Sequence, residues 1–170
     1  MLLAISTTSY AQHQCGTLPT EEQLEYMNSI RAEFKENFNA RTHASNVRVP
    51  VKFFIIRRSD GSGGLNNNRP ATLLNEVNSL YDAAQIEFFE TEPATEIEDT
   101  DFYDLNQSEE STLANPRDIG GVINIYVSGT LSSAGGDPLC GYTRFPPSTD
   151  RIFLALGCTD NEFGTTAHEL

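Results

Sequence analysis

The chain has 170 residues, of which 38% are hydrophobic and 21% charged, as in a soluble globular protein large enough to bury a core. Its 24 acidic residues outnumber its 11 lysines and arginines, so the net charge is -13 at pH 7. Such a chain repels phosphate backbones and anionic lipid surfaces, which excludes nucleic acid and membrane surfaces as expected partners. No apolar run reaches the roughly 18 residues that a transmembrane helix requires.

Residues 1–11 are predicted to be the remnant of a signal peptide. A short apolar run is followed by small polar residues, and Ser9 and Ala11 place small side chains at the two positions that a signal peptidase reads. The basic residues that usually open a signal peptide are missing. On the pattern of small residues we expect a secreted, extracellular protein; a frayed, untargeted N-terminus is the alternative.

An extracellular location permits disulfides. Cys140 and Cys158 flank two predicted strands and are candidates for one bridge, with reduced thiols as the alternative. A partner for Cys15 is left open.

Residues 12–46 are predicted to form an N-terminal helical segment, with a helix from Thr20 to Asn39. Thr20 and Gln23 have the spacing of a capping box. Apolar residues then recur at intervals of three and four, which predicts a stripe packed into the core: Leu24, Met27, Ile30, Phe34 and Phe38.

The remaining residues, 47–170, begin with a strand–helix–strand pattern. Residues 47–57 change from an alternating pattern to an apolar run, which is typical of a strand that enters a covered sheet. Pro50 indicates an edge or an irregular entry to this strand. A helix opens at Pro70, and a short strand follows at 86–89, so we expect the two strands to be parallel. The predicted buried side of the helix comprises Leu73, Leu74, Val77, Leu80, Tyr81 and Ala84.

Residues 90–117 are crowded with acids and are predicted to form a solvated excursion. Phe102, Tyr103 and Leu105 are expected to anchor it to the body. Carboxylates can bind calcium, but the alternating ligands and turn glycine of a calcium loop are missing. Calcium therefore stays an open second cofactor.

Three further strands are predicted at 121–127, 141–145 and 150–156, with a glycine-rich loop at 128–138. The two prolines after Phe145 close the strand at 141–145, which suits an edge strand or a turn. A last helix is expected after Thr159, with Glu162 at capping-box distance. The predicted fold is α+β, with a twisted mixed sheet of about five strands and packed helices.

The last helix ends on His168 and Glu169, which suggest metal-assisted hydrolysis. A catalytic zinc ion needs neutral imidazoles as ligands, and a carboxylate beside it can take the proton from the bound water. In zinc proteases a glutamate directly follows the first histidine, and a second histidine lies four positions after the first. That second position would fall two residues past Leu170. His13 and His43 lie in the leader and in a loop, where we expect solvated side chains.

Seven phrases resemble, in order, successive landmarks of the pappalysin family of metzincin zinc proteases. They are CGT at 15–17, VPVKFFII at 49–56, the helix from Pro70, INIYV at 123–127, LCGYTRFP at 139–146, DRIFLAL at 150–156 and TTAHEL at 165–170. The resemblance covers nearly the whole chain. It implies that 47–170 is the upper subdomain of a metalloprotease catalytic domain, without its lower subdomain.

The resemblance also implies roles for single residues. His168 would be the first zinc ligand and Glu169 the general base, while Gly141, Tyr142 and Thr143 would belong to an edge strand that aligns a peptide or protein substrate. The chain has no counterpart of the second and third ligands or of the family's methionine turn. We therefore expect an N-terminal fragment of a secreted zinc endopeptidase that is itself inactive. The alternative is a non-catalytic extracellular binding or adhesion domain.

Overall fold

The structure is a computed structural model that describes residues 19–37, 47–144, 149–159 and 165–170. The predicted signal remnant, Cys15, His13 and His43 lie outside the described residues. None of the helices in the described ranges is both long and apolar enough to cross a membrane.

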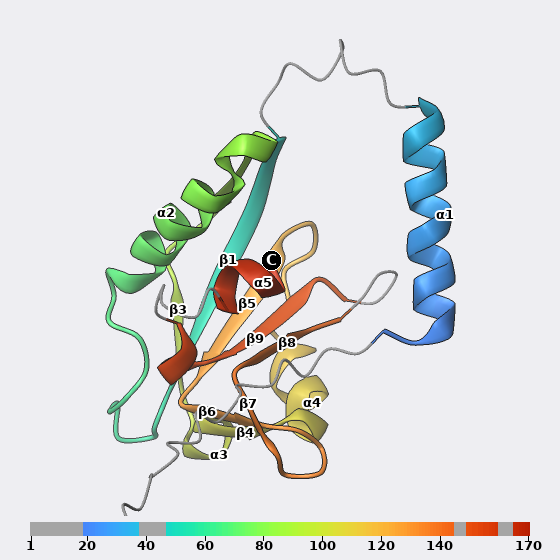
Figure 1. The fold of residues 1–170 in the computed structure, drawn as a ribbon. Helices are drawn as coiled ribbons and strands as arrows, with labels where there is room; N and C mark the ends of the chain where they lie inside the picture. The colour runs from blue at the N-terminus through green and yellow to red at the C-terminus, as the bar shows by residue number, and fades with distance from the viewer. Residues whose placement is uncertain (1–18, 38–46, 145–148, 160–164) are drawn as a thin grey trace, which may run out of the picture.

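A mixed sheet forms the centre of the molecule (Figure 1). Its strand order is β2-β1-β5-β9-β8, and β3 pairs with the later part of β1. All pairs are parallel except β8 with β9, which is antiparallel. The α+β prediction is therefore confirmed, as is the parallel pairing of the first two strands. The strands are β1 (Val47–Arg57), β2 (Ile86–Glu90), β3 (Thr95–Glu98), β5 (Ile123–Ser128), β8 (Gly141–Thr143) and β9 (Arg151–Ala155).

The central position of β1 follows from its apolar run. Residues 51–56 are all buried, because β1 has neighbouring strands on both sides and cover on both faces. Pro50 lies before the point where β5 begins to pair, opposite Val51. The Val47 N–H donates to Gln85 on the β2 side, so alternation turns the Pro50 nitrogen away from β2. The missing donor therefore falls where β1 has no partner, and Pro50 marks an irregular entry rather than an edge.

One face of the sheet is covered by α2 (Arg69–Tyr81), which continues into the 3-10 helix η1 (Asp82–Ala84). Leu73, Leu74 and Val77 are buried in one cluster with apolar residues of β1, β5 and β9. The prediction was wrong for Leu80, which is 60% exposed, and for Ala84. The helix rests on the sheet along a narrower stripe than its apolar residues suggest.

The opposite face is covered by the segments that were predicted to be a solvated excursion and a loop. They form a second sheet, in the order β4-β6-β7, together with short helices. The prediction was wrong because single apolar residues, among them Leu105, Leu113 and Leu131, are buried against the main sheet. Phe102, Tyr103 and Leu105 do anchor the acidic segment as expected. The elements are α3 (Thr100–Tyr103), β4 (Asp104–Asn106), η2 (Gln107–Glu109), α4 (Glu110–Ala114), β6 (Thr130–Ser132) and β7 (Pro138–Leu139).

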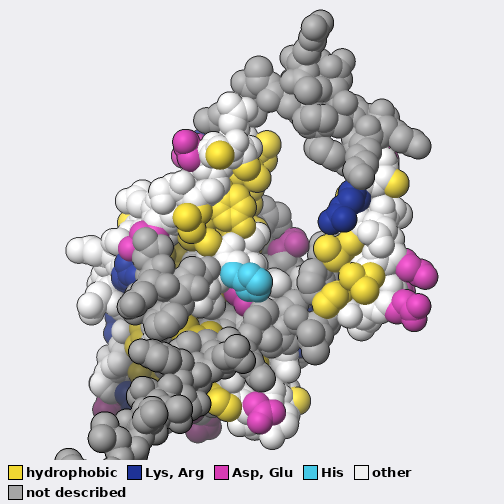
Figure 2. Space-filling view, in the orientation of Figure 1, with side chains coloured by type: hydrophobic (Ala, Val, Ile, Leu, Met, Phe, Trp, Pro, Cys, Tyr) yellow, Lys and Arg dark blue, Asp and Glu magenta, His cyan; other side chains and the backbone are white. Residues whose placement is uncertain are grey.

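The helix α1 (Glu21–Asn37) begins as predicted, but none of its described side chains belongs to the two core clusters. The Thr20 N–H donates to Gln23 Oε1, and the Gln23 N–H donates to Thr20 Oγ1, which completes the capping box. Leu24 and Ile30 are each 44% exposed, so their expected burial was wrong, and Met27 is partly exposed. The side chains of Phe34 and Phe38 lie outside the described part of the chain. Figure 1 shows α1 standing beside the sheet, and Figure 2 shows apolar side chains on its surface.

Candidate active site at α5 and β8

His168 and Glu169 lie on the short helix α5 (Thr165–Glu169). Successive residues of a helix point about 100° apart, and here one side chain faces solvent while the other faces the sheet. Glu169 is only 4% exposed, whereas His168 is exposed (Figure 2, cyan). The side chains of the predicted base and the predicted ligand thus point to different sides of α5.

The predicted start of this helix differs from the structure. Thr159 ends the 3-10 helix η3 (Leu156–Cys158), and its hydroxyl donates to the carbonyl oxygen of Leu156 over 2.8 Å. Glu162, its expected capping partner, lies outside the described residues. Thr159 therefore closes η3 in the structure and is not shown to cap α5.

Two contacts attach α5 and the segment before it to α2. The Tyr81 hydroxyl donates to the carbonyl oxygen of Ala167 over 2.9 Å. Arg69 Nη2 donates to the carbonyl oxygen of Thr159 over 2.7 Å. Ala167 and Leu170 also pack on the apolar cluster beneath α2. These contacts fix the distance between α5 and the sheet, and the Glu169 side chain points towards β8.

The strand β8 ends the strand order of the main sheet, and no other described strand pairs with it. The edge prediction is therefore confirmed for Gly141–Thr143, while Phe145 lies outside the described residues. The Ala155 N–H donates to the carbonyl oxygen of Cys140, so alternation turns the backbone groups of Gly141 away from β9.

Gly141 is the residue of β8 that meets Glu169. A Cβ atom on Gly141 would lie 3.2 Å from Glu169 Cγ, 3.1 Å from the carbonyl oxygen of Phe153 and 3.2 Å from a methyl carbon of Leu154. The glutamate stem therefore lies directly on the backbone of the edge strand. The predicted base and the predicted substrate strand are brought together by the fold.

Tyr142 points to the face of the sheet opposite α5, where its ring is the last in a row, or ladder, of stacked aromatic rings. The ring centroids are 4.7 Å apart for Phe54 and Tyr126, 5.1 Å for Tyr126 and Phe153, and 4.8 Å for Phe153 and Tyr142. The four rings come from β1, β5, β9 and β8, so the ladder runs across the sheet. It fixes the edge strand to the centre, because stacked aromatic pairs contribute beyond their buried area.

A buried ion cluster on the same face was not predicted from the sequence. The Glu110 carboxylate accepts from Arg144 Nε over 3.0 Å and lies 3.5 Å from Arg151 Nη1. Arg151 also donates to Asp118, whose carboxylate accepts from the Tyr126 hydroxyl over 2.7 Å. The cluster therefore ties the end of β8 to β9, β5 and α4.

The cluster and its burial change three pKa values. The hydrogen bond from Arg144 to Glu110 raises the pKa of the Arg144 guanidinium. Burial raises the pKa of the Tyr126 and Tyr142 hydroxyls, and the charges of Asp118 and Glu110 respectively add to the effect. Both tyrosines therefore stay neutral well beyond their ordinary range.

A disulfide joins Cys140, directly before β8, to Cys158 in η3, with Cα atoms 5.5 Å apart. The candidate bridge predicted from the sequence is thus present in the structure. It holds the start of the edge strand against the segment that leads towards α5. Disulfide, ring ladder and ion cluster together fix both ends of β8.

The described residues do not complete a zinc site. A catalytic zinc ion takes three protein ligands, and His168 supplies one imidazole. Within 19–37, 47–144, 149–159 and 165–170, no group of three or more His, Cys, Asp or Glu side chains could hold a metal ion. Of the three histidines in the sequence, His168 alone lies within the described residues.

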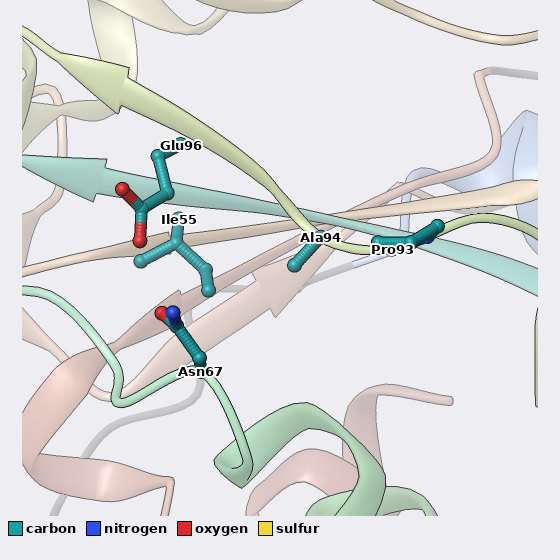
Figure 3. A pocket seen from close by; sticks show the side chains of 5 residues that line it. All are labelled: Ile55, Asn67, Pro93, Ala94 and Glu96. Atoms are coloured by element: carbon teal, nitrogen blue, oxygen red, sulfur yellow. The ribbon is translucent and has the colours of Figure 1, made fainter.

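A separate hollow of about 250 Å³ lies beside β1 and the start of β3, away from β8 in the strand order; Figure 3 shows its lining residues. Ile55 of β1, Asn67 before α2, and Pro93, Ala94 and Glu96 around the start of β3 line it. Glu96 Oε1 forms a salt bridge with Arg57 Nη2 at 2.8 Å. None of the residues predicted for the site reaches this hollow.

Searches of protein-family models and of curated proteins find no match for this chain.

Proposed function

We propose that the chain is the upper subdomain of a secreted zinc endopeptidase of the pappalysin type, with its catalytic centre at α5. One observation carries the proposal. Glu169, assigned as the base from its motif, lies against Gly141 of the strand assigned to substrate. The two residues come from separate sequence landmarks, and an accidental His-Glu pair would not require this contact.

In this proposal an extended peptide adds to the outer edge of β8. The outward-facing backbone of Gly141 offers hydrogen bonds to such a peptide, and main-chain pairing of this kind accepts many sequences. The ring ladder and the ion cluster hold β8 flat and extended before the peptide arrives. A pre-ordered edge reduces the entropy lost on binding.

Glu169 acts as the general base. Its carboxylate takes a proton from the water whose oxygen bonds to the scissile carbonyl carbon, and the proton then passes to the leaving amine nitrogen. Zinc, when bound, lowers the pKa of the water and polarises the carbonyl group. The burial of Glu169 keeps its carboxylate from swinging freely into solvent.

His168 is proposed as the first ligand, and its exposure leaves the imidazole accessible to a metal ion. The second and third ligands would follow Leu170 in the gene, so the 170 residues alone are expected to be inactive. The proposed substrates are peptides or proteins.

A zinc titration of the protein extended past Leu170 tests the proposal. We expect one tightly bound zinc ion, and an affinity that falls by at least about 100-fold in His168→Ala. His168→Ala in the unextended chain is the control, where no tight zinc binding is expected for either form. If the extended protein binds no zinc, or if the gene codes no histidine two residues past Leu170, the assignment is wrong.

A non-catalytic extracellular binding domain is the second candidate. The position of β8 at the end of the described strand order favours it, because strand addition needs no metal. Peptide binding that is unchanged by zinc and by His168→Ala, without cleavage, would support this candidate.

A further inference from the structure

We propose that Gly141 is a positioning residue, whose lack of a side chain sets the place of the Glu169 carboxylate over the edge strand. The inference rests on the proposed function only for the catalytic meaning of Glu169. Its geometric part stands on the packing of α5 against β8.

The first step of the argument is the space at Gly141. A Cβ at this position would meet three neighbours between 3.1 and 3.2 Å, which is tighter than ordinary contact. One of them, the carbonyl oxygen of Phe153, belongs to the ladder between β8 and β9 and cannot move cheaply. The other two neighbours, the Leu154 methyl group and the Glu169 stem, are side-chain atoms and can yield; Glu169 is the one on a short helix.

The second step is that glycine is not required here by the backbone. Gly141 is absent from the positive-φ glycines, so an alanine could adopt its conformation. The need for glycine at this position is therefore the close approach of three groups: the Phe153 carbonyl oxygen, the Leu154 methyl group and the glutamate stem.

The third step is that Glu169 has little freedom in other directions. Tyr81 holds the carbonyl oxygen of Ala167, and Leu170 packs on the apolar cluster beneath α2. Since these contacts hold the helix from the other side, an added methyl group would displace the Glu169 side chain by rotation about its own bonds and not by a shift of α5. A displacement of about 1 Å at a catalytic group can lower the rate by about 100-fold.

The test compares Gly141→Ala with Gly120→Ala. Gly120 also lacks a positive φ and has no neighbour within 4 Å of a Cβ position, so it is a matched control. In the 170-residue chain we expect a nuclear Overhauser contact between Gly141 Hα and Glu169 Hγ. Gly141→Ala should lower Tm by about 2–10 °C in the wild type. In a Glu169→Ala background, the same substitution should lower Tm by a smaller amount, with a difference of at least about 2 °C. Gly120→Ala should leave Tm and the contact unchanged.

In the zinc-loaded extended protein, Gly141→Ala should reduce kcat by about 10- to 100-fold with KM within about twofold, because orientation and not binding is lost. A missing contact in the wild type would overturn the inference. The inference would also be overturned if Gly141→Ala had the same Tm and kcat as Gly120→Ala, and if its effect on Tm did not depend on Glu169. A third outcome separates the two proposals. If the nuclear Overhauser contact is seen and the Tm effect of Gly141→Ala depends on Glu169, but Glu169→Gln cleaves peptides like the wild type, the positioning by Gly141 stands and the proposed function fails.

Discussion

Replacing Glu110 by glutamine removes a buried negative charge that two guanidinium groups share. The Glu110 side chain is 8% exposed, and those of Arg151 and Arg144 are 6% and 39% exposed. Removing one partner of a buried ion pair costs about 3–5 kcal/mol. Arg151 keeps Asp118 and Arg144 reaches solvent, so we expect a smaller loss, about 2–3 kcal/mol. For a chain of this size the loss corresponds to a Tm lower by about 4–12 °C.

Urea denaturation followed by circular dichroism at pH 7 measures this loss. Glu87→Gln is the matched control, because Glu87 pairs with Arg48 at 3.1 Å but both side chains are about half exposed. Such exposed pairs contribute about 0–1 kcal/mol. The reasoning is refuted if both variants unfold at the same urea concentration.

Three further predictions address the disulfide, the buried tyrosines and α1. Reduction of Cys140–Cys158, whose sequence separation is 18, should cost about 3 kcal/mol, seen as a lower Tm with dithiothreitol; an unchanged Tm would show that the bridge does not constrain the chain. The pKa values of Tyr126 and Tyr142 are higher in the folded protein than in the unfolded chain. Their contribution to the free energy of unfolding is therefore complete below pH 10 and is lost as the pH rises further. Their phenolate absorbance should therefore appear only together with unfolding, and early ionisation in the folded protein would contradict this. Leu24→Ala should change the free energy of unfolding by less than about 0.5 kcal/mol, since Leu24 is largely exposed; a loss of 2 kcal/mol or more would show that α1 packs on a partner surface.

The sequence predicts an element correctly where its apolar pattern matches the burial that the element has in the fold. The apolar run of β1 requires cover on both faces, and the structure provides it. The helix α1 shows the limit of such patterns, because its apolar spacing resembles that of a buried helix. Burial depends on a partner surface that no local pattern encodes.

The acidic segment was misjudged for a related reason. Its charges dominate the composition, yet Leu105 and Leu113 are fully buried and hold it on the sheet. Glu110 was counted among the solvated acids, whereas arginines distant in the sequence enclose it. An ion pair between distant residues leaves no spacing signal.

The candidate site was predicted only as separate pieces. The motif at His168 and Glu169 predicted a base and a ligand, and the prolines after Phe145 predicted an edge strand. Neither pattern indicates that Glu169 rests on Gly141, because that contact depends on the height of α5 above the sheet. A glycine inside a predicted strand is a weak sign of close approach.

The most direct test of the proposed function is the rate of peptide-bond hydrolysis by the zinc-loaded extended protein and by its Glu169→Gln variant. Glutamine keeps the shape of the side chain but cannot accept the proton from water. We expect cleavage by the wild type and a kcat lower by about 100- to 10,000-fold in the variant, with zinc still bound. Equal rates for the two proteins, or no hydrolysis of any peptide by the zinc-loaded wild type, would contradict the proposed role of Glu169.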